Sequence, residues 1–123
     1  MKKLIFFILT IFTFTNISAQ EINIFSSRHY QSDKELYKKF TNETGIKVNI
    51  ISGKDNALHR RIKEEGKDCL GDLYFTADAG RLGAFELQGL FQKGVNSEFI
   101  KKTVPKNFRS DYWVGIAKRA RVI

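Results

Sequence analysis

Two adjacent residues with metal-binding side chains, His29 and Tyr30, follow the first apolar–polar alternation after residue 20. A neutral imidazole and a phenolate are both ligands for an oxidised transition metal. Because a phenol has an unperturbed pKa of about 10, only a strongly acidic ion such as ferric iron displaces its proton easily at neutral pH. The pair therefore indicates a candidate ferric site. The alternative, which these two residues by themselves favour, is a loop histidine and tyrosine that pack over the edge of a sheet.

Two arginines near the end of the chain could hold an anion. Arg119 and Arg121 are two residues apart, so in a strand both side chains point to the same side. Two guanidinium groups on one face bind phosphate, carbonate or carboxylate. A solvated basic edge that limits aggregation is the alternative interpretation.

The remaining chemical signals are weak. A single cysteine, Cys69, excludes an intramolecular disulfide and a cysteine-based zinc cluster, and two histidines exclude a three-histidine metal site. We expect Cys69 to be a small buried hydrophobe, and we expect His59 and Asp33 to lie on helix surfaces. The sequence has no glycine-rich phosphate loop, no metalloprotease or hydrolase motif, and no acid–base pair fixed by spacing. It therefore indicates a binding protein and not an enzyme.

Hydrophobic periodicity predicts the elements that position these residues. Strands are predicted at 21–26, 46–51 and 72–76, and the third is apolar enough to be buried on both faces. Helices are predicted from Ser32 to Gly45, around 57–65, and at 78–88. Ser32 and Glu35 form a capping-box pattern, and glycines at 45, 66 and 89 are expected to end the helices. A helical turn at 97–102 and strands at 112–116 and from 121 complete the prediction.

The order β-α-β-α-β-α predicts an α/β fold with a mainly parallel sheet flanked by helices. In an open sheet of this kind, ligands bind beyond the carboxyl ends of the strands. Three connections should meet there, at 26–30, 52–54 and 76–81. The candidate pair His29–Tyr30 lies in the first of them.

The N-terminus has the three parts of a secretory signal peptide. Lys2 and Lys3 precede an uncharged apolar run at 4–14, and small residues end at Ala19. We therefore expect residues 1–19 to be removed on export and 20–123 to form the fold. The net charge of +8 falls by two with the leader. Export weakens a nucleic-acid explanation for the remaining basic charge.

The C-terminus runs apolar into Ile123, with no turn or cap, whereas chain ends usually fray in polar residues. We therefore expect the chain to be part of a longer protein. Several short motifs occur in a specific order and spacing. They are IFSSRHY at 24–30, TGIKV at 44–48, RIKEEG at 61–66, TADAGRL at 76–82, GLF at 89–91, WVGI at 113–116 and KRARVI at 118–123.

With these motifs the chain from Ile22 to Ile123 resembles the N-terminal part of periplasmic ferric iron-binding proteins of ABC transporters, most closely the cyanobacterial type. The resemblance implies a periplasmic binding protein-like (type II) fold of two lobes, of which 20–123 would be a partial first lobe, incomplete at the C-terminus. It implies capture of ferric iron in the periplasm and delivery to the membrane permease, with the full-length protein a monomer.

The resemblance also implies roles for individual residues. His29 and Tyr30 would ligate the iron, and tyrosines of the second lobe would supply further donors. Arg119 and Arg121 would support a synergistic anion such as carbonate or citrate. Some relatives place a glutamate after the third strand, but 76–78 contains none, so we assign no ligand there. Two ligands alone predict weak or no specific iron binding by this chain.

Three alternatives stay open at this point. The same two-lobed architecture also carries other small ligands, such as an anion, thiamine or a polyamine. A small secreted α/β enzyme is the second alternative, although a nucleophile–base signature is absent. A nucleic-acid binder fits the charge, but the leader and the lack of a binding motif count against it.

Overall fold

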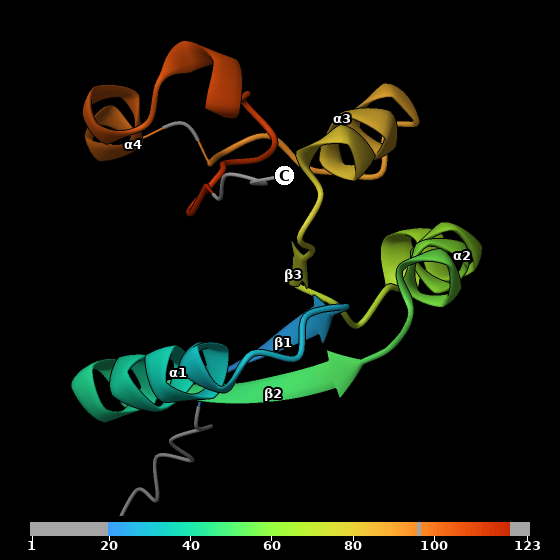
Figure 1. Ribbon diagram of the computed structural model, residues 1–123. Helices are drawn as coiled ribbons and strands as arrows, with labels where there is room; N and C mark the ends of the chain where they lie inside the picture. The colour runs from blue at the N-terminus through green and yellow to red at the C-terminus, as the bar shows by residue number, and fades with distance from the viewer. Residues whose placement is uncertain (1–19, 96, 119–123) are drawn as a thin grey trace, which may run out of the picture.

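The computed structural model describes residues 20–95 and 97–118 of the chain. Three strands alternate with helices and are followed by a short helical region (Figure 1). The elements are β1 (Glu21–Ser26), α1 (Gln31–Thr44), β2 (Lys47–Ser52), α2 (Asp55–Glu65), η1 (Gly66–Asp68), β3 (Leu73–Phe75), α3 (Ala79–Leu87), α4 (Glu98–Thr103) and η2 (Lys106–Phe108). The predicted β-α-β-α-β-α order is confirmed.

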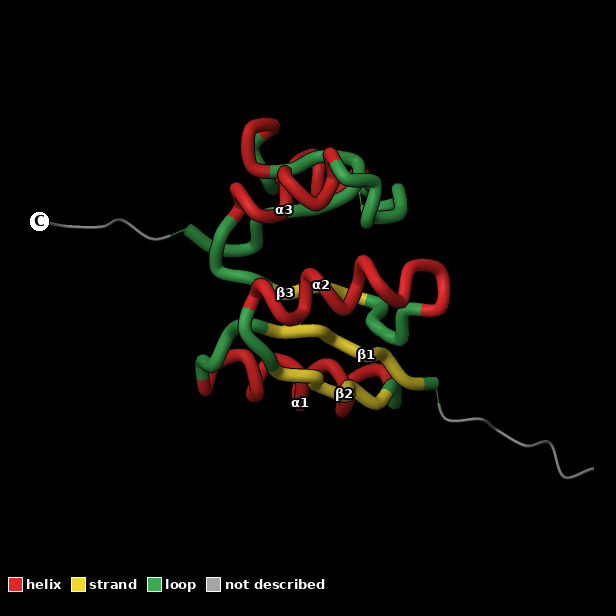
Figure 2. Tube along the Cα trace, turned by 90° about the vertical axis from the view of Figure 1, so that its right-hand side faces the viewer, coloured by secondary structure: helices red, strands yellow, loops and turns green. Residues whose placement is uncertain are grey.

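The strands form a parallel sheet in the order β2-β1-β3. Its register pairs Phe25 with Tyr74 and Ser26 with Phe75, so these pairs lie on opposite faces. Tyr74 lies on the face covered by α2 and α3, since its ring stacks on that of Phe85 of α3, with centroids 5.0 Å apart. Phe75 instead meets Tyr37 of α1, with ring centroids 6.1 Å apart. The helices therefore cover both faces, with α3 and α1 on opposite sides of the sheet (Figure 2).

One cluster of buried side chains forms the core between β1, α2 and α3. Its buried members are Phe25, Leu58, Ile62 and Phe85. Partly buried residues pack against this cluster from β2, β3 and the connections, and they are Ile51, Cys69, Tyr74, Leu90 and Phe91. Cys69 packs against the cluster as expected of a small hydrophobe, but it is only partly buried.

Glycines end the first two helices as predicted. Gly45 has φ +74°, a left-handed conformation that costs little without a Cβ, and its N–H donates to the Thr41 carbonyl at 2.9 Å. Gly66 follows α2, and its N–H donates to the carbonyl of Ile62. Asp78 begins α3 by accepting a hydrogen bond from the Gly80 N–H at 2.9 Å.

Three local predictions are wrong. The helix α1 begins at Gln31 with Tyr30 as its N-cap and no side-chain cap, so the Ser32–Glu35 capping box does not form. The third strand is not buried on both faces, because Leu73 is 48% exposed and β3 pairs only with β1 among the described residues. Residues 112–116 form no strand, and a single antiparallel bridge joins Val114 to Arg109.

The strand expected from residue 121 and the leader at 1–19 lie outside the described residues. In the described ranges, every helix is too short or too polar to span a bilayer. A cleft of about 730 Å³ lies between β3 and residues 112–117, and its walls include Leu73, Phe91 and Trp113.

Candidate metal-binding edge of the sheet

The carboxyl ends of all three strands meet at one edge of the sheet. The last residues of β1, β2 and β3 are Ser26, Ser52 and Phe75. The register aligns Ser26 with each of the other two. Hydrogen bonds continue one step beyond the strands, from the Gly53 N–H to the Ser26 carbonyl and from the Ser27 N–H to the Phe75 carbonyl, each at 3.1 Å. The three connections predicted to meet at this edge therefore do so.

These connections surround a shallow hollow of about 360 Å³. Its lining combines an imidazole, two cations and polar groups from the start of α2. The lining residues are Ser27, His29, Gly53, Lys54, Asp55, Asn56 and Arg81. His29 is exposed and lines the hollow.

Tyr30 follows His29 but is held differently. Tyr30 as a whole residue is 48% exposed, and it does not line the hollow. The guanidinium carbon of Arg28 lies 5.0 Å from the centre of this ring, within the range of a cation–π contact. The structure thus places both predicted ligands in one exposed loop at the sheet edge, with His29 at the hollow and Tyr30 beside Arg28.

Arg28 is itself fixed by a bidentate ion pair. Its Nε and Nη2 donate to the two carboxylate oxygens of Asp33 at 2.8 and 2.9 Å. The pKa of Arg28 is raised, chiefly because of the hydrogen bond to Asp33. Asp33 is buried in the first turn of α1, so its expected position on the helix surface is wrong.

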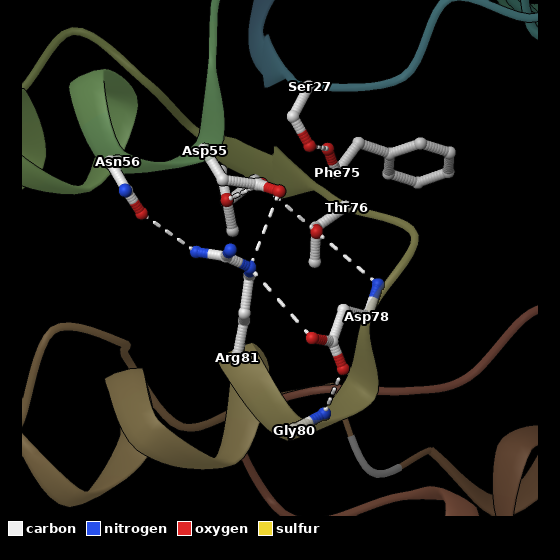
Figure 3. A network of polar contacts seen from close by, with 9 residues as sticks. Ser27, Asp55, Asn56, Phe75, Thr76, Asp78, Gly80 and Arg81 are labelled. Carbon is white, nitrogen blue, oxygen red and sulfur yellow. Dashed lines mark hydrogen bonds and ion pairs between the residues drawn. The ribbon is translucent and has the colours of Figure 1, made fainter.

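A second network joins the connections after β2 and β3 (Figure 3). Asp55 accepts hydrogen bonds from the Tyr74 hydroxyl and from Thr76 Oγ1, the latter at 3.1 Å. Arg81 Nε lies 3.4 Å from Asp55 Oδ2 and 3.8 Å from Asp78 Oδ2. Arg81 Nη1 also donates to Asn56 Oδ1 at 3.0 Å.

The network shifts the ionisation of its members. Burial raises the pKa of Asp55, but hydrogen bonds from Ser27, Tyr74 and Thr76 and the charge of Arg81 outweigh it, so the pKa is lowered. Burial and the neighbouring Asp55 raise the pKa of Tyr74 well above the usual value for a phenol. Tyr74 is therefore a protonated donor at neutral pH, and Asp55 is an ionised acceptor.

This chemistry limits what the edge can bind by itself. Within residues 20–95 and 97–118, no three histidine, cysteine, aspartate or glutamate side chains are grouped to hold a metal. The Asp55 carboxylate is already occupied by Tyr74, Thr76 and Arg81. The predicted ligands His29 and Tyr30 are both exposed, and they supply two of the about six donors that an octahedral ion takes.

The other sequence candidates fall elsewhere. Arg119 and Arg121 lie outside the described residues, so the predicted anion site keeps the status of a prediction. His59 lies in the middle of α2 and stacks on Phe85, with ring centroids 4.3 Å apart. The sequence alone did not single out Arg28 or Asp55, which the structure places in two polar networks at this edge. A signal existed for Arg28, since Asp33 follows it by five residues across a predicted helix start.

Comparisons with known proteins find similar proteins that are named for iron uptake or ferric binding. No protein-family model matches the chain. The chain is 53% identical over 106 residues to iron uptake protein A1 of Synechocystis, a match that covers 85% of this chain and 29% of the relative. The chain therefore spans less than a third of the length of this relative.

Solved structures agree with the sequence match. A Trichodesmium protein (IdiA, FutA), solved in complex with iron and citrate ligands, superimposes with a TM-score of 0.71 at 43% identity, covering 77% of this chain and 30% of that protein. A ferric binding protein from Campylobacter jejuni gives a TM-score of 0.70 at 37% identity, covering 74% and 29%. The parallel sheet with its flanking helices is thus the fold of the corresponding part of these iron-binding proteins.

Proposed function

We propose that this chain forms part of the first lobe of a ferric iron-binding protein that serves an ABC importer. The observation that carries the proposal is the exposed His29–Tyr30 pair at the carboxyl edge of the sheet. It occurs in a chain that is 53% identical to an iron uptake protein and shares its fold with a protein solved with iron and citrate. The role is binding and release, without catalysis.

Ferric iron is the cargo in this proposal. The neutral His29 imidazole supplies a nitrogen donor, and Tyr30 supplies a phenolate oxygen after the ion displaces the phenol proton. Both side chains are exposed, so neither has to leave a packed core to reach the ion. Since two donors leave a ferric ion unsaturated, further ligands come from the part of the relatives' length that this chain does not span.

The accompanying partners follow from the same proposal. A synergistic anion such as carbonate or citrate would bind the guanidinium groups of Arg119 and Arg121. The leader pattern at 1–19 directs the protein to the periplasm, where it would act as a monomer and deliver iron to the membrane permease.

A chimera tests the function. Residues 20–123 replace the matching part of Synechocystis iron uptake protein A1, and ferric citrate is titrated while the tyrosinate-to-iron charge-transfer band is recorded. We expect the band in the chimera and strong binding, whereas the chain alone should bind weakly. His29→Ala and Tyr30→Phe should each weaken iron retention, and the Tyr30 variant should also reduce the band.

Matched controls separate the site from the fold. His59→Gln and Tyr112→Phe change the same residue types outside the lining of the hollow, and they should leave iron retention unchanged. A chimera that binds no iron would contradict the proposed function. Unchanged affinity in both His29→Ala and Tyr30→Phe would contradict the assignment of the ligands.

A further inference from the structure

We propose that Arg28 is a positioning residue that holds the Tyr30 ring in place before iron arrives. The inference rests on the proposed function, because it treats Tyr30 as an iron ligand. Arg28 would act through Tyr30 and would not contact the metal. Three features of the structure support this role: the ion pair with Asp33, the stacking of the guanidinium, and the anchoring of the Arg28 backbone.

The ion pair fixes the plane of the guanidinium. Two parallel hydrogen bonds of 2.8 and 2.9 Å join Arg28 to Asp33, and the two side chains are only 16% and 11% exposed. A bidentate pair of this kind allows one orientation of the guanidinium, whereas an exposed pair at the surface allows many. Asp33 is rigid in turn, because it lies in the first turn of α1 and its N–H donates to the Tyr30 carbonyl at 3.2 Å.

The fixed guanidinium contacts two aromatic rings. Its carbon lies 5.0 Å from the centroid of Tyr30 and 5.3 Å from that of Phe75. Phe75 is the last residue of β3, so the contact ties the Tyr30 ring to the end of a neighbouring strand. A planar guanidinium can stack on a ring and pair with a carboxylate at the same time, and an ammonium group cannot reproduce both contacts.

The backbone of Arg28 is anchored as well. The Arg28 N–H donates to Ser26 Oγ at 3.1 Å, and the Ser26 hydroxyl donates to the Arg28 carbonyl at 3.4 Å. Ser26 is one of the most deeply buried residues of the described chain. The Arg28 side chain therefore starts from a backbone that is held to the end of β1, and it ends at a carboxylate on α1.

This arrangement acts through geometry more than through charge. The carboxylate of Asp33 compensates the positive charge of Arg28, so the pair adds little net field at Tyr30. A side chain that is already in one orientation loses less entropy when it binds a ligand. Arg28 would thus strengthen iron binding by limiting the orientations of the exposed Tyr30 ring.

The test uses Arg28→Lys in the purified full chain with isotope-labelled tyrosine rings. Lysine keeps the charge but loses the bidentate fork and the flat stacking surface. Tyr30→Phe identifies the Tyr30 ring signals in the NMR spectrum. Gallium(III) citrate is then titrated as a diamagnetic probe of a ferric site, because NMR detects weak binding.

We expect Arg28→Lys to move the Tyr30 ring signals toward those of an unstructured tyrosine and to weaken the gallium response several-fold. Asp33→Asn, which removes the charged partner, should shift the same signals in the same direction. Arg61→Lys is the matched control, since Arg61 also pairs with a carboxylate, that of Glu65, and lies over the ring of Phe25 at 4.9 Å. It should leave the Tyr30 signals and the gallium response unchanged.

Each other outcome has a defined meaning. If both Arg28→Lys and Asp33→Asn leave the Tyr30 ring signals in place, or if the ring moves without any change in gallium binding, the positioning role is overturned. If gallium does not perturb the Tyr30 ring signals in the unsubstituted chain, and the chimera also binds no iron, it is the proposed function that fails. The ring signals alone then decide whether Arg28 holds Tyr30.

Discussion

An ion pair between Asp55 and Arg81 joins the start of α2 to the first turn of α3, two segments that are far apart in the sequence. Arg81 Nε lies 3.4 Å from Asp55 Oδ2 at the rim of the hollow beside His29. Both side chains are partly exposed, so the ion pair contributes at most about 1 kcal/mol to stability by itself. Its larger consequence is structural, because it fixes one wall of the hollow.

The lowered pKa of Asp55 predicts a pH-dependent contribution to stability. The contribution is complete above the unfolded carboxyl pKa of about 3.9, and it is lost as the pH falls through the lower folded-state pKa. Asp55→Asn should therefore cost about 1 kcal/mol at neutral pH and much less in acid. Urea unfolding of both proteins at neutral and at acidic pH measures this difference.

The control is Glu35→Gln, which removes an exposed carboxylate from α1. It should change the free energy of unfolding little at either pH. An Asp55→Asn cost that is the same in neutral and acidic solution would contradict the prediction, because the lost interaction would then not depend on the Asp55 charge.

Local signals in the sequence were sufficient to predict most of the fold. The strand at 21–26 matches β1 at both ends, and α2 ends before Gly66 as expected. These signals are strong because they depend on only a few neighbouring residues: the alternation of apolar and polar residues in a strand, and the glycine in a left-handed conformation that ends a helix. The parallel sheet followed from the order of the elements.

The errors occurred where distant residues decide the local structure. Ser32 does not cap α1, because the chain already enters the helix at Gln31, next to the Arg28–Asp33 pair. The segment 112–116 has the composition of a strand, but the Trp113 indole donates to Glu86 of α3 at 2.7 Å and only Val114 makes a bridge. A pattern of apolar residues does not specify which partner is available to pair.

The candidate site was predictable in part. His29 and Tyr30 were predicted because both residue types are metal ligands and they follow a strand; the structure places them at the sheet edge, and their role as ligands stays a prediction. Asp55 was not, because its partners Tyr74 and Thr76 are 19 and 21 residues away in the sequence. The sheet register brings them together, and no spacing rule indicates such a contact.

The glycines at 45 and 83 should respond in opposite ways to alanine. Gly45 has φ +74°, where a Cβ is strained, so Gly45→Ala should destabilise the protein by about 1 kcal/mol. Gly83 lies within α3 with open space at its Cβ position, so Gly83→Ala should stabilise by about 0.4–1 kcal/mol. Thermal unfolding of both variants checks the signs, and a shift in the same direction for both would contradict the described helix end.

The single thiol should react slowly in the folded protein. Cys69 packs against the core cluster, and burial raises the pKa of its thiol, which lowers the thiolate fraction. A disulfide reagent added at mildly alkaline pH should therefore label the native protein several-fold more slowly than the protein in urea. The signal has one source, since the chain has no other cysteine. Equal rates in both conditions would show that Cys69 is not protected.

Two leucines test where the core lies. Leu58 of α2 is 4% exposed and Leu87 at the end of α3 is 90% exposed. Leu58→Ala removes buried methyl groups and leaves a cavity, so it should cost about 2–5 kcal/mol, while Leu87→Ala should change stability by less than about 0.5 kcal/mol. Because the substitution and the helical setting are the same, the difference between the two variants isolates burial. Urea midpoints measure the difference, and equal midpoints would mean that α2 does not pack on Phe25 as described.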